Sequence, residues 1–550
     1  MGTQSVGLPK LIALELVAVA VIAAIALGAG IGSAGIASGY VDPLLHAGAQ
    51  DEAVYGHAAA VMVRTSHWMT PVFLERFMLN KPPLLMWAGA ASMRLMGISP
   101  IALRVPVLAA AVLCCVLIYW WVRRSRSIAA GLASVALLLG MPVFFSISRK
   151  FMTDALLTLF VVAAMFVIAV DPRWERRGSP ALFGVLSGAG IMTKSAAGLL
   201  PLLILAIYWI FARSNERPPL RKVFVALAAA ILVAAPWHVY QFVLHRDWFM
   251  AEYVRFQLLG SGVTAPSRYT GDTNLWFYAK TLWLTDPILV LIWATSVPWI
   301  VMAWKRASEA RLLAAWFLTV AASLLVFGTR AAYYLLPLLP AMALASVCFS
   351  PLFRGWAAWV TCAALIVAFC LTADYKARSV PGAAALVDYA EHEPTNELLI
   401  VSPDDEFYAS VINLPKVRYV YVSPLDPTKT SEFFYRLGMI VSGDEFCALP
   451  RLMPVYEQRL HAWKLPEDLH PEATLIDSGS VSKLAELIRC SPDRDFMIPE
   501  QLRHIAVDAG DKTHVAGPLI DGKFILFAKA RKPKTRVTVA PGALVPISIQ

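Results

Sequence analysis

Apolar runs long enough to cross a lipid bilayer recur along the first two thirds of this 550-residue chain. The first extends from Leu11 to about Ile36, and another, Leu103–Val122, ends in basic residues. A helix of about 20 apolar residues spans the hydrocarbon core, whereas a signal peptide has an apolar core of only about 7–15 residues. The first run therefore predicts a retained transmembrane helix. Further spans are predicted at roughly 128–147, 155–170, 181–192, 196–212, 223–242, 281–303, 312–328, 331–348 and 355–372.

Composition supports the same fold class. Hydrophobic residues make up 58% of the chain and charged residues 16%, against about 45–50% and about 25% in soluble globular proteins. Intrinsic disorder requires low hydrophobicity and high charge, so it is excluded. The sequence predicts a polytopic α-helical membrane protein with about 11–13 transmembrane helices.

The formal net charge of +10 comes from basic residues that gather in short loops between the apolar runs. No basic stripe or nucleic-acid motif accompanies them, so we expect no nucleic-acid partner. If the short apolar segment 82–96 lies in the membrane interface, every basic loop falls on one side, which the positive-inside rule makes cytosolic. The clusters are Arg123, Arg124 and Arg126; Arg173, Arg176 and Arg177; Arg213, Arg217, Arg221 and Lys222; Lys305, Arg306 and Arg311; and Arg354.

From residue 373 onward the chain is charged and contains no spanning segment. Strand-like runs alternate there with helix-like ones, which predicts an α/β domain over 373–550, periplasmic by the topology above. Residues 1–372 then form a transmembrane domain with a periplasmic first loop at 37–102. The strand-like runs are Glu397–Val401, Val417–Val422 and Lys523–Phe527, and the helix-like ones are Ala383–Glu391 and Val481–Ile488.

Two of the seven cysteines, Cys447 and Cys490, lie in polar sequence. Because the periplasm is oxidising, we expect a disulfide between them. The chain has no CxxC motif and no histidine spacing typical of a zinc site. The sequence names no cofactor and leaves the need for a divalent metal open.

Polar residues in or beside the spans converge on the predicted outer face. Such groups are costly in a membrane and are functional candidates, although Asp51 or Asp154 could instead cap a helix and Lys81 could snorkel. Acids and bases together favour an outward-facing active site, whereas a transporter would place them near mid-membrane on broken helices. They are Asp51, Glu52, Lys81, Ser148, Arg149, Lys150, Asp154, Thr193, Lys194, His238, His245, Arg255, Arg268, Tyr269, Arg330, Tyr333 and Tyr334.

Five motifs occur in order over residues 50–340: Asp51-Glu52-Ala-Val-Tyr55, Asn80-Lys81-Pro82-Pro83-Leu84, Ser148-Arg149 followed by Asp154, Thr193-Lys194, and Tyr334-Leu-Leu-Pro337-Leu-Leu-Pro340. Together they resemble the GT-C membrane glycosyltransferases. The similarity is to the lipid A aminoarabinose transferases and to the bacterial relatives of protein O-mannosyltransferases. Two positions depart from the family pattern: Asn80 stands where a glutamate is usual, and Ser195 where a glycine is usual.

This resemblance implies transfer of a sugar, 4-amino-4-deoxy-L-arabinose, from undecaprenyl phosphate to lipid A at the periplasmic face of a bacterial inner membrane. It implies that Asp51 is the catalytic carboxylate, with Glu52 beside it, that Asp154 is a second site carboxylate, and that Lys81 binds the donor phosphate. The resemblance further implies a role in lipopolysaccharide modification and polymyxin resistance. Further substrate-binding candidates are Arg149, Lys194, Arg255, Arg268, Arg330, Tyr333 and Tyr334.

The residue types fit this chemistry. Negative charge develops on the phosphate that leaves, and fixed cations stabilise it. Lysine supplies a point charge and arginine a bidentate contact. A carboxylate can deprotonate an acceptor hydroxyl or stabilise positive charge on the sugar. The alternatives are a protein hydroxyl or an envelope glycan as acceptor, a lipid-linked sugar transporter or flippase, and a membrane-anchored binding module.

Overall fold

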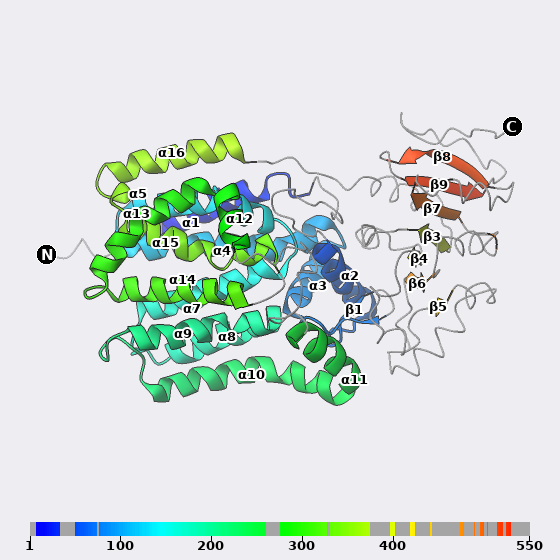
Figure 1. Ribbon diagram of the computed structural model, residues 1–550, viewed down its shortest axis with the longest axis horizontal. Coiled ribbons are helices and arrows are strands. Elements are labelled where there is room, and N and C mark those ends of the chain that lie inside the picture. The colour runs from blue at the N-terminus through cyan, green and yellow to red at the C-terminus, as the bar shows by residue number, and fades with distance from the viewer. Residues whose placement is uncertain are drawn as a thin grey trace. The chain divides into compact units, whose positions relative to one another are not determined.

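The computed structural model describes residues 7–32, 50–73, 76–259, 276–326 and 330–373, seven strands between 397 and 529, and the single residues 489 and 503. The chain divides into two compact units (Figure 1). The first, here called the helical unit, comprises Met1–Gly32, Val41–Gly48 and Leu79–Ala377. The second, called the sheet unit, comprises Ser33–Tyr40, Ala49–Met78 and Arg378–Gln550.

The helical unit begins with α1 (Gly7–Gly28), and its next helices follow the predicted apolar runs closely. Ser99 and Ser127 supply the side-chain caps that start α4 and α5, because each hydroxyl accepts a backbone N–H three residues on. The predicted run 128–147 is divided into α5 and a short α6. The elements are α3 (Leu84–Met96), α4 (Pro100–Ser125), α5 (Ile128–Leu139), α6 (Pro142–Ile147), α7 (Thr153–Val170), α8 (Ser179–Lys194), η1 (Ser195–Leu199) and α9 (Leu200–Phe211).

The second half of the helical unit contains an unexpected break. The run 281–303, predicted as one span, is divided between α12 and α13, which meet at Asp286 with a bend of 110°. Pro287 follows the break, and proline lacks the N–H that a continuous helix needs there. The elements are α10 (Leu220–Leu244), α11 (Arg246–Trp248), η2 (Phe249–Leu259), α12 (Phe277–Thr285), α13 (Pro287–Ala303), α14 (Ser308–Val326), η3 (Ala332–Leu335), α15 (Leu339–Phe349), η4 (Pro351–Phe353) and α16 (Ala357–Thr372).

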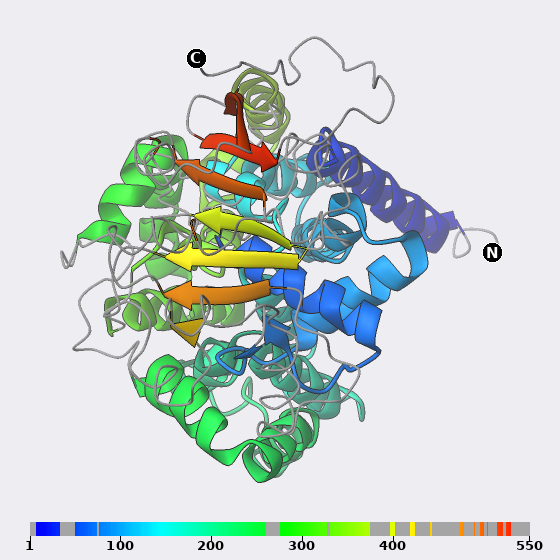
Figure 2. The same ribbon diagram turned by 90° about the vertical axis from the view of Figure 1, so that its right-hand side faces the viewer.

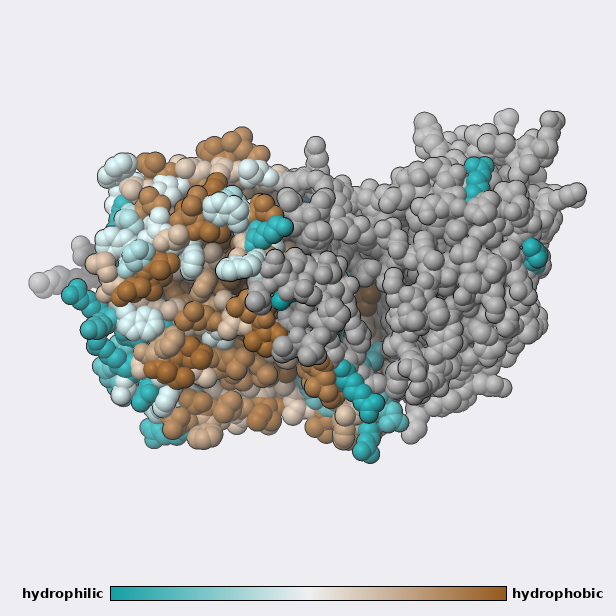
Figure 3. All heavy atoms as spheres, viewed as in Figure 1, coloured by the Kyte–Doolittle hydropathy of each residue, from teal (hydrophilic) through white to brown (hydrophobic). Residues whose placement is uncertain are grey.

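The prediction of a polytopic helical membrane protein is confirmed. By length and composition, six helices in the described ranges can cross a membrane, or up to seven if the bent pair is one span. The predicted number of about 11 is reached only when the shorter α5, α15 and α16 are counted and α8 and α9 are separated. Exposed apolar side chains cover the outer surface of the helical unit, and hydrophilic ones gather at its ends (Figure 3).

Small residues bring the backbones of α8 and α10 close together. A Cβ built on Gly184 would lie 2.2 Å from the carbonyl oxygen of Ala226, and one on Gly188 would lie 2.7 Å from that of Ala230. This spacing of small residues four apart is typical of close helix pairs in membranes. The chain then reverses between α8 and α9, where the backbone of Gly198 packs directly against that of Gly190.

The basic loops gather at one end of the helical unit, here called the basic end. The Lys222 ammonium donates to the carbonyl oxygen of Trp174 at 2.6 Å, which joins the loop before α8 to the start of α10. Arg213 donates to the carbonyl oxygen of Lys305, which joins the loop after α9 to the loop before α14. Residues far apart in sequence thus meet as the positive-inside pattern requires.

Asp171 closes α7 at this end. Its carboxylate accepts hydrogen bonds from the Ser179 hydroxyl at 2.7 Å and from the backbone N–H groups of Glu175 and Arg176 at 2.7 and 2.9 Å. Burial alone would raise the pKa of Asp171, but these hydrogen bonds and the charge of Arg176 together lower it below its usual 3.8.

The sheet unit contains helix α2 (Gln50–Thr65), a small hairpin of β1 (Val72–Phe73) and β2 (Arg76–Phe77), and a seven-stranded sheet (Figure 2). The sheet order is β5-β6-β4-β3-β7-β9-β8, with parallel pairing from β5 through β7 and antiparallel pairing of β9 with β7 and β8. The strands are β3 (Glu397–Val401), β4 (Arg418–Ser423), β5 (Val441–Ser442), β6 (Ala473–Asp477), β7 (Asp495–Pro499), β8 (His514–Ile520) and β9 (Phe524–Lys529).

Three of these strands, β3, β4 and β9, match the strand-like runs of the sequence to within two residues. The predicted helices Ala383–Glu391 and Val481–Ile488 lie outside the described residues. So do Cys447 and Cys490, and their disulfide therefore stays a prediction.

Candidate active site

A buried ion pair joins two of the predicted site residues across 40 positions of sequence. Asp154 lies in the first turn of α7, and its carboxylate receives a charge-assisted hydrogen bond from the ammonium of Lys194 at the end of α8. The Asp154 side chain is 2% exposed and that of Lys194 is 10% exposed. Two charges taken out of water are tolerated only when they are paired and hydrogen-bonded. The pair therefore fixes the ends of α7 and α8 together.

Two tyrosines cover the lysine of this pair. The Lys194 nitrogen is 4.4 Å from the ring centroid of Tyr334 and 5.4 Å from that of Tyr333. Both distances lie within the range of a cation–π interaction. The two rings meet edge to face, with centroids 4.8 Å apart, and both lie on η3. The predicted candidates Tyr333 and Tyr334 thus form an aromatic wall beside the cation.

Arg330 adds a second cation to this cluster. Its side chain is buried, and it lies two residues before the first residue of η3. The hydroxyl of Tyr278 on α12 is within electrostatic range of both the Arg330 guanidinium and the Asp154 carboxylate. Helices α7, α8 and α12 and the segment 330–335 therefore bring one acid, two bases and three phenol rings to the same end of the helical unit. We call these six residues the polar cluster.

The Lys81 motif is held by a different element, η2. The backbone N–H of Leu79 donates to the Glu252 carboxylate at 2.6 Å, and the Lys81 ammonium donates to the Gln257 side-chain oxygen at 2.7 Å. Glu252 is buried. Residues on both sides of Asn80 are thus tied to one short segment about 170 positions away. Helix α3 begins directly after the two prolines of the motif, a residue type that is favoured at helix starts.

The segment η2 is a π-helix, a rare form that is frequent at functional sites. Its Tyr253 hydroxyl lies 2.7 Å from a ring nitrogen of His238 on α10 and next to the Ser195 hydroxyl, one residue beyond Lys194. The segment therefore contacts the Lys81 motif on one side and the end of α8 on the other.

The remaining candidates lie elsewhere or outside the described residues. Arg149 donates to the carbonyl oxygen of Ala29 and lies 4.9 Å from the Phe145 ring centroid, so it anchors the end of α1. Arg255 is exposed on η2. Arg268 belongs to 260–275, outside the described residues.

Asp51 and Glu52 belong to the sheet unit. Helix α2 starts at Gln50, so both carboxylates lie within its first turn rather than Asp51 capping a helix that begins at Glu52. Acidic side chains are stabilised there by the partial positive charge of the helix N-terminus. Glu52 is fully buried and Asp51 is half-buried.

Sequence reasoning missed three residues of this region: Glu252, Gln257 and Tyr278. Glu252 carried a signal, because it is an acid in the predicted outer stretch 240–280, where only basic and aromatic residues were considered. Gln257 and Tyr278 are ordinary residue types in their local sequence and carried none.

Within the described residues, no group of three or more histidine, cysteine, aspartate or glutamate side chains is placed to hold a metal ion. The Lys81 motif, with Asn80 in place of a glutamate, offers an amide there instead of a carboxylate.

Part of the chain is similar in sequence to known proteins. Residues 80–240 match the model of the dolichyl-phosphate-mannose-protein mannosyltransferase family. The chain is 32% identical over 199 residues to the undecaprenyl phosphate-alpha-4-amino-4-deoxy-L-arabinose arabinosyl transferase of Aeromonas salmonicida, and 27% identical over 196 residues to that of Yersinia pestis (strain Pestoides F). These alignments cover 34% of this chain and only 35–36% of the relatives' own length.

Solved structures extend the similarity to the whole fold. The structure of ArnT from Cupriavidus metallidurans bound to undecaprenyl phosphate superposes with a TM-score of 0.67, over 95% of this chain and 99% of that one, at 14% identity. The same protein in the apo state gives 0.66.

The fold is thus that of a polytopic helical membrane protein similar in structure to ArnT. Over about a third of its length, the chain is also similar in sequence to proteins named undecaprenyl phosphate-aminoarabinose transferases.

Proposed function

We propose that this protein is a membrane glycosyltransferase that uses an undecaprenyl-phosphate-linked sugar as donor. The observation that carries the proposal is the polar cluster: a buried acid–base pair under two tyrosines, with a second buried cation, at one end of a membrane-spanning helical unit. A lipid-linked donor can reach such a site by lateral diffusion and expose only its headgroup to water. The relatives named as arabinosyl transferases and the ArnT structures support this class of reaction.

We further propose that the sugar is 4-amino-4-deoxy-L-arabinose and that the acceptor is lipid A at the periplasmic face of the bacterial inner membrane. The names of the similar transferases support the sugar. On this proposal, residues 1–372 form the catalytic domain and 373–550 a periplasmic accessory domain. A protein hydroxyl is the second candidate acceptor, because the matching family model describes protein mannosyltransferases.

In the proposed reaction, the acceptor oxygen forms a bond to the anomeric carbon while the bond from that carbon to the phosphate oxygen breaks. The phosphate leaves with the electron pair, and undecaprenyl phosphate is the second product. Lys81 and Arg330 stabilise the charge that develops on the phosphate. A low effective dielectric among apolar helices strengthens each of these interactions.

Asp51 is proposed to take the proton of a hydroxyl acceptor, or to orient a phosphate acceptor, with Glu52 beside it. Asp154 is proposed as a second site carboxylate. It acts by holding the Lys194 ammonium in place and keeping it charged. Lys194, Arg255, Arg268, Tyr333 and Tyr334 are proposed to bind substrate. Arg149, which donates to the carbonyl oxygen of Ala29, stays a candidate for the same role.

Two variants separate binding from chemistry. Lys81→Ala should weaken donor binding by about 1.5–3 kcal/mol, the value of a charge-assisted hydrogen bond. Asp51→Asn should leave donor binding intact and lower single-turnover transfer by about 10²-fold or more. The matched control is Lys280→Ala, because Lys280 is an exposed lysine on α12. Donor affinity and transfer are measured with purified protein in nanodiscs.

Mass spectrometry of lipid A with and without the protein then tests the acceptor. An added aminoarabinose that depends on Asp51 supports lipid A. Unmodified lipid A together with a labelled envelope protein would support the second acceptor. Movement of the lipid-linked sugar across vesicle membranes without covalent transfer would show a transporter. Broken helices such as α12–α13 also occur in transporters.

A further inference from the structure

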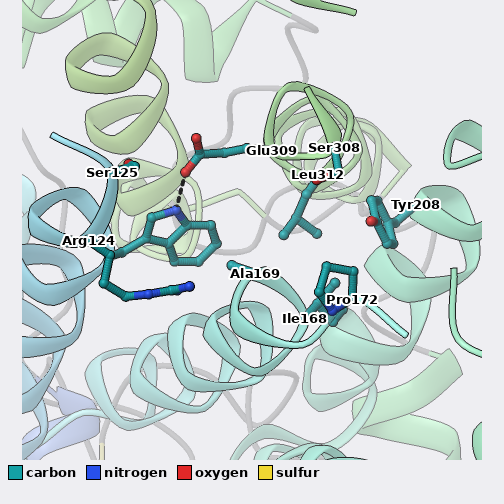
Figure 4. A pocket seen from close by; sticks show the side chains of 10 residues that line it. Arg124, Ser125, Ile168, Ala169, Pro172, Tyr208, Ser308, Glu309 and Leu312 are labelled. Atoms are coloured by element: carbon teal, nitrogen blue, oxygen red, sulfur yellow. Dashed lines mark hydrogen bonds between the residues drawn. The ribbon is translucent and has the colours of Figure 1, made fainter. Parts of the chain in front are cut away.

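A cavity of about 170 Å³ lies at the basic end of the helical unit (Figure 4). The ends of four helices, α4, α7, α9 and α14, enclose it. Its Ile168 and Ala169 stand 14 and 15 residues after Asp154 on the same helix, which corresponds to about 21 Å at 1.5 Å per residue. The cavity is therefore separate from the polar cluster. Its lining residues are Trp121, Arg124, Ser125, Ile168, Ala169, Pro172, Tyr208, Ser308, Glu309 and Leu312.

The cavity contains a carboxylate without a basic partner. Glu309 accepts a hydrogen bond from the Trp121 indole nitrogen, drawn as a dashed line in Figure 4, and a weak one from the Cys348 thiol. No ion pair joins Glu309 to a lysine or arginine in the described part of the chain. Arg126, which approaches from α4, donates to the carbonyl oxygen of Cys348 instead.

The same cavity contains a cation without an acidic partner. Arg124 is exposed, and its guanidinium carbon lies 5.9 Å from the Phe166 ring centroid. Across the described ranges, Arg124 forms no ion pair with an aspartate or glutamate. Figure 4 shows its side chain extending toward Ala169, into the space between the helices. Arg124 and Glu309 thus line one cavity without neutralising each other.

We propose that this cavity binds a phosphoethanolamine headgroup, with its phosphate on Arg124 and its ammonium on Glu309. A guanidinium binds phosphate through two parallel hydrogen bonds, and the free carboxylate oxygen accepts from an ammonium. The hydroxyls of Ser125 and Ser308 supply further hydrogen bonds. A cavity of roughly 150 Å³ holds a molecule the size of benzene, so this volume admits a small headgroup and not a whole lipid.

The surface beside Arg124 suits the rest of a phospholipid. Trp120 is 38% exposed and packs on Phe166, with ring centroids 5.1 Å apart. Tryptophan is enriched where a protein meets the membrane–water interface, and an acyl chain can lie along such a ring. This favours phosphatidylethanolamine over free phosphoethanolamine as the source of the headgroup.

Native mass spectrometry of the full chain, after delipidation, tests the proposal with three probe lipids. Phosphatidylethanolamine should bind at least about tenfold more tightly than phosphatidylglycerol. Phosphatidylglycerol lacks the ammonium and therefore cannot form the charged hydrogen bond to Glu309. Phosphatidylcholine, whose trimethylammonium has no N–H to donate, should bind as weakly as phosphatidylglycerol. Free phosphoethanolamine added to the delipidated protein should compete only at concentrations far above those of the lipid.

Three variants locate the site. Glu309→Gln keeps an acceptor for Trp121 but should abolish the preference for phosphatidylethanolamine over phosphatidylglycerol. Arg124→Gln should weaken both lipids. The control Arg177→Gln removes an exposed arginine of the basic end that lies outside the cavity, and it should change neither.

Equal binding of the three lipids to the unmodified protein would overturn the proposal, as would an unchanged preference in Glu309→Gln. Competition by free phosphoethanolamine at lipid-like concentrations would assign the site to the soluble molecule instead. These measurements need no glycosyl transfer, so they stand apart from the proposed enzymatic function.

Discussion

Removing either charge of the Asp154–Lys194 pair should destabilise the helical unit strongly. The two side chains are 2% and 10% exposed, so neutralising one leaves the other charge buried among apolar helices. Such a change costs about 3–5 kcal/mol. Lys194→Met preserves the aliphatic stem against the tyrosines but also removes the cation–π contact, worth about 0.5–2 kcal/mol. Asp154→Asn preserves shape and removes only the charge.

The double variant, Asp154→Asn with Lys194→Met, separates pairing from packing. It leaves no uncompensated charge, so its loss of stability should be smaller than the sum of the two single losses. Contacting residues in such cycles show interaction energies of about 0.5–3 kcal/mol, and a buried pair should lie at the upper end. Thermal unfolding in detergent gives the Tm of each variant at constant protein and detergent concentration.

The pair Arg173–Glu175, at 53% and 73% exposed, provides the solvent-exposed control. Neutralising Arg173, Glu175 and both should give a coupling of at most about 1 kcal/mol, as expected of exposed ion pairs. If the Asp154 and Lys194 shifts in Tm add without interaction, or couple no more than the control, the pair is not a buried electrostatic anchor.

Three further outcomes are expected. Glu252→Ala should weaken donor binding by about 1–3 kcal/mol, because it leaves the Leu79 N–H unsatisfied; in a donor titration, Glu252→Gln should lose less, and equal losses would contradict the positioning role. Asp171→Asn should lower the Tm near neutral pH but not at low pH: the folded-state pKa lies below 3.8, so the stabilisation exists above that value and disappears as pH falls through the folded-state pKa. Ser195→Gly should raise the Tm, because Ser195 has φ 50° and ψ −126°, a conformation that costs a side-chain-bearing residue about 1–3 kcal/mol; an unchanged or lower Tm would show that the serine is not strained.

Much of the helical unit follows from apolar run length and charge alone. The ends of α4, α7, α8 and α9 fall close to the predicted boundaries, since a change from apolar to charged sequence marks where a helix leaves the membrane. The sequence predicted only that Asp154 and Lys194 lie on the same side of the membrane. It did not predict that they form an ion pair. Consecutive spans return to the same face, but which helix ends touch depends on packing such as the glycine contact of α8 with α10.

Other features could not be derived in the same way. The break at Asp286 was signalled by the aspartate–proline pair, but hydropathy averaged over the run 281–303 concealed it. The π-helix η2 has no sequence pattern of its own, because its wider turn is held by tertiary contacts such as that of Glu252 with Leu79. The sequence showed only that Ser195 stands where the family usually has glycine. The positive φ of Ser195 explains that glycine, because glycine adopts such a conformation without strain.

The short helices α5 and α15 have a consequence for how the chain enters the membrane during synthesis. They contain 12 and 11 residues, too few to cross a bilayer alone, and nearly all are buried against other helices. Helix α15 is made after most of its neighbours, so it can dock as it emerges from the ribosome. Helix α5 packs on both α4 and the much later α16. Its face against α16 therefore stays uncovered, with only α4 packed beside it, until α16 has been synthesised. A chain released before α16 would expose that face of α5 to lipid and to membrane quality-control proteases.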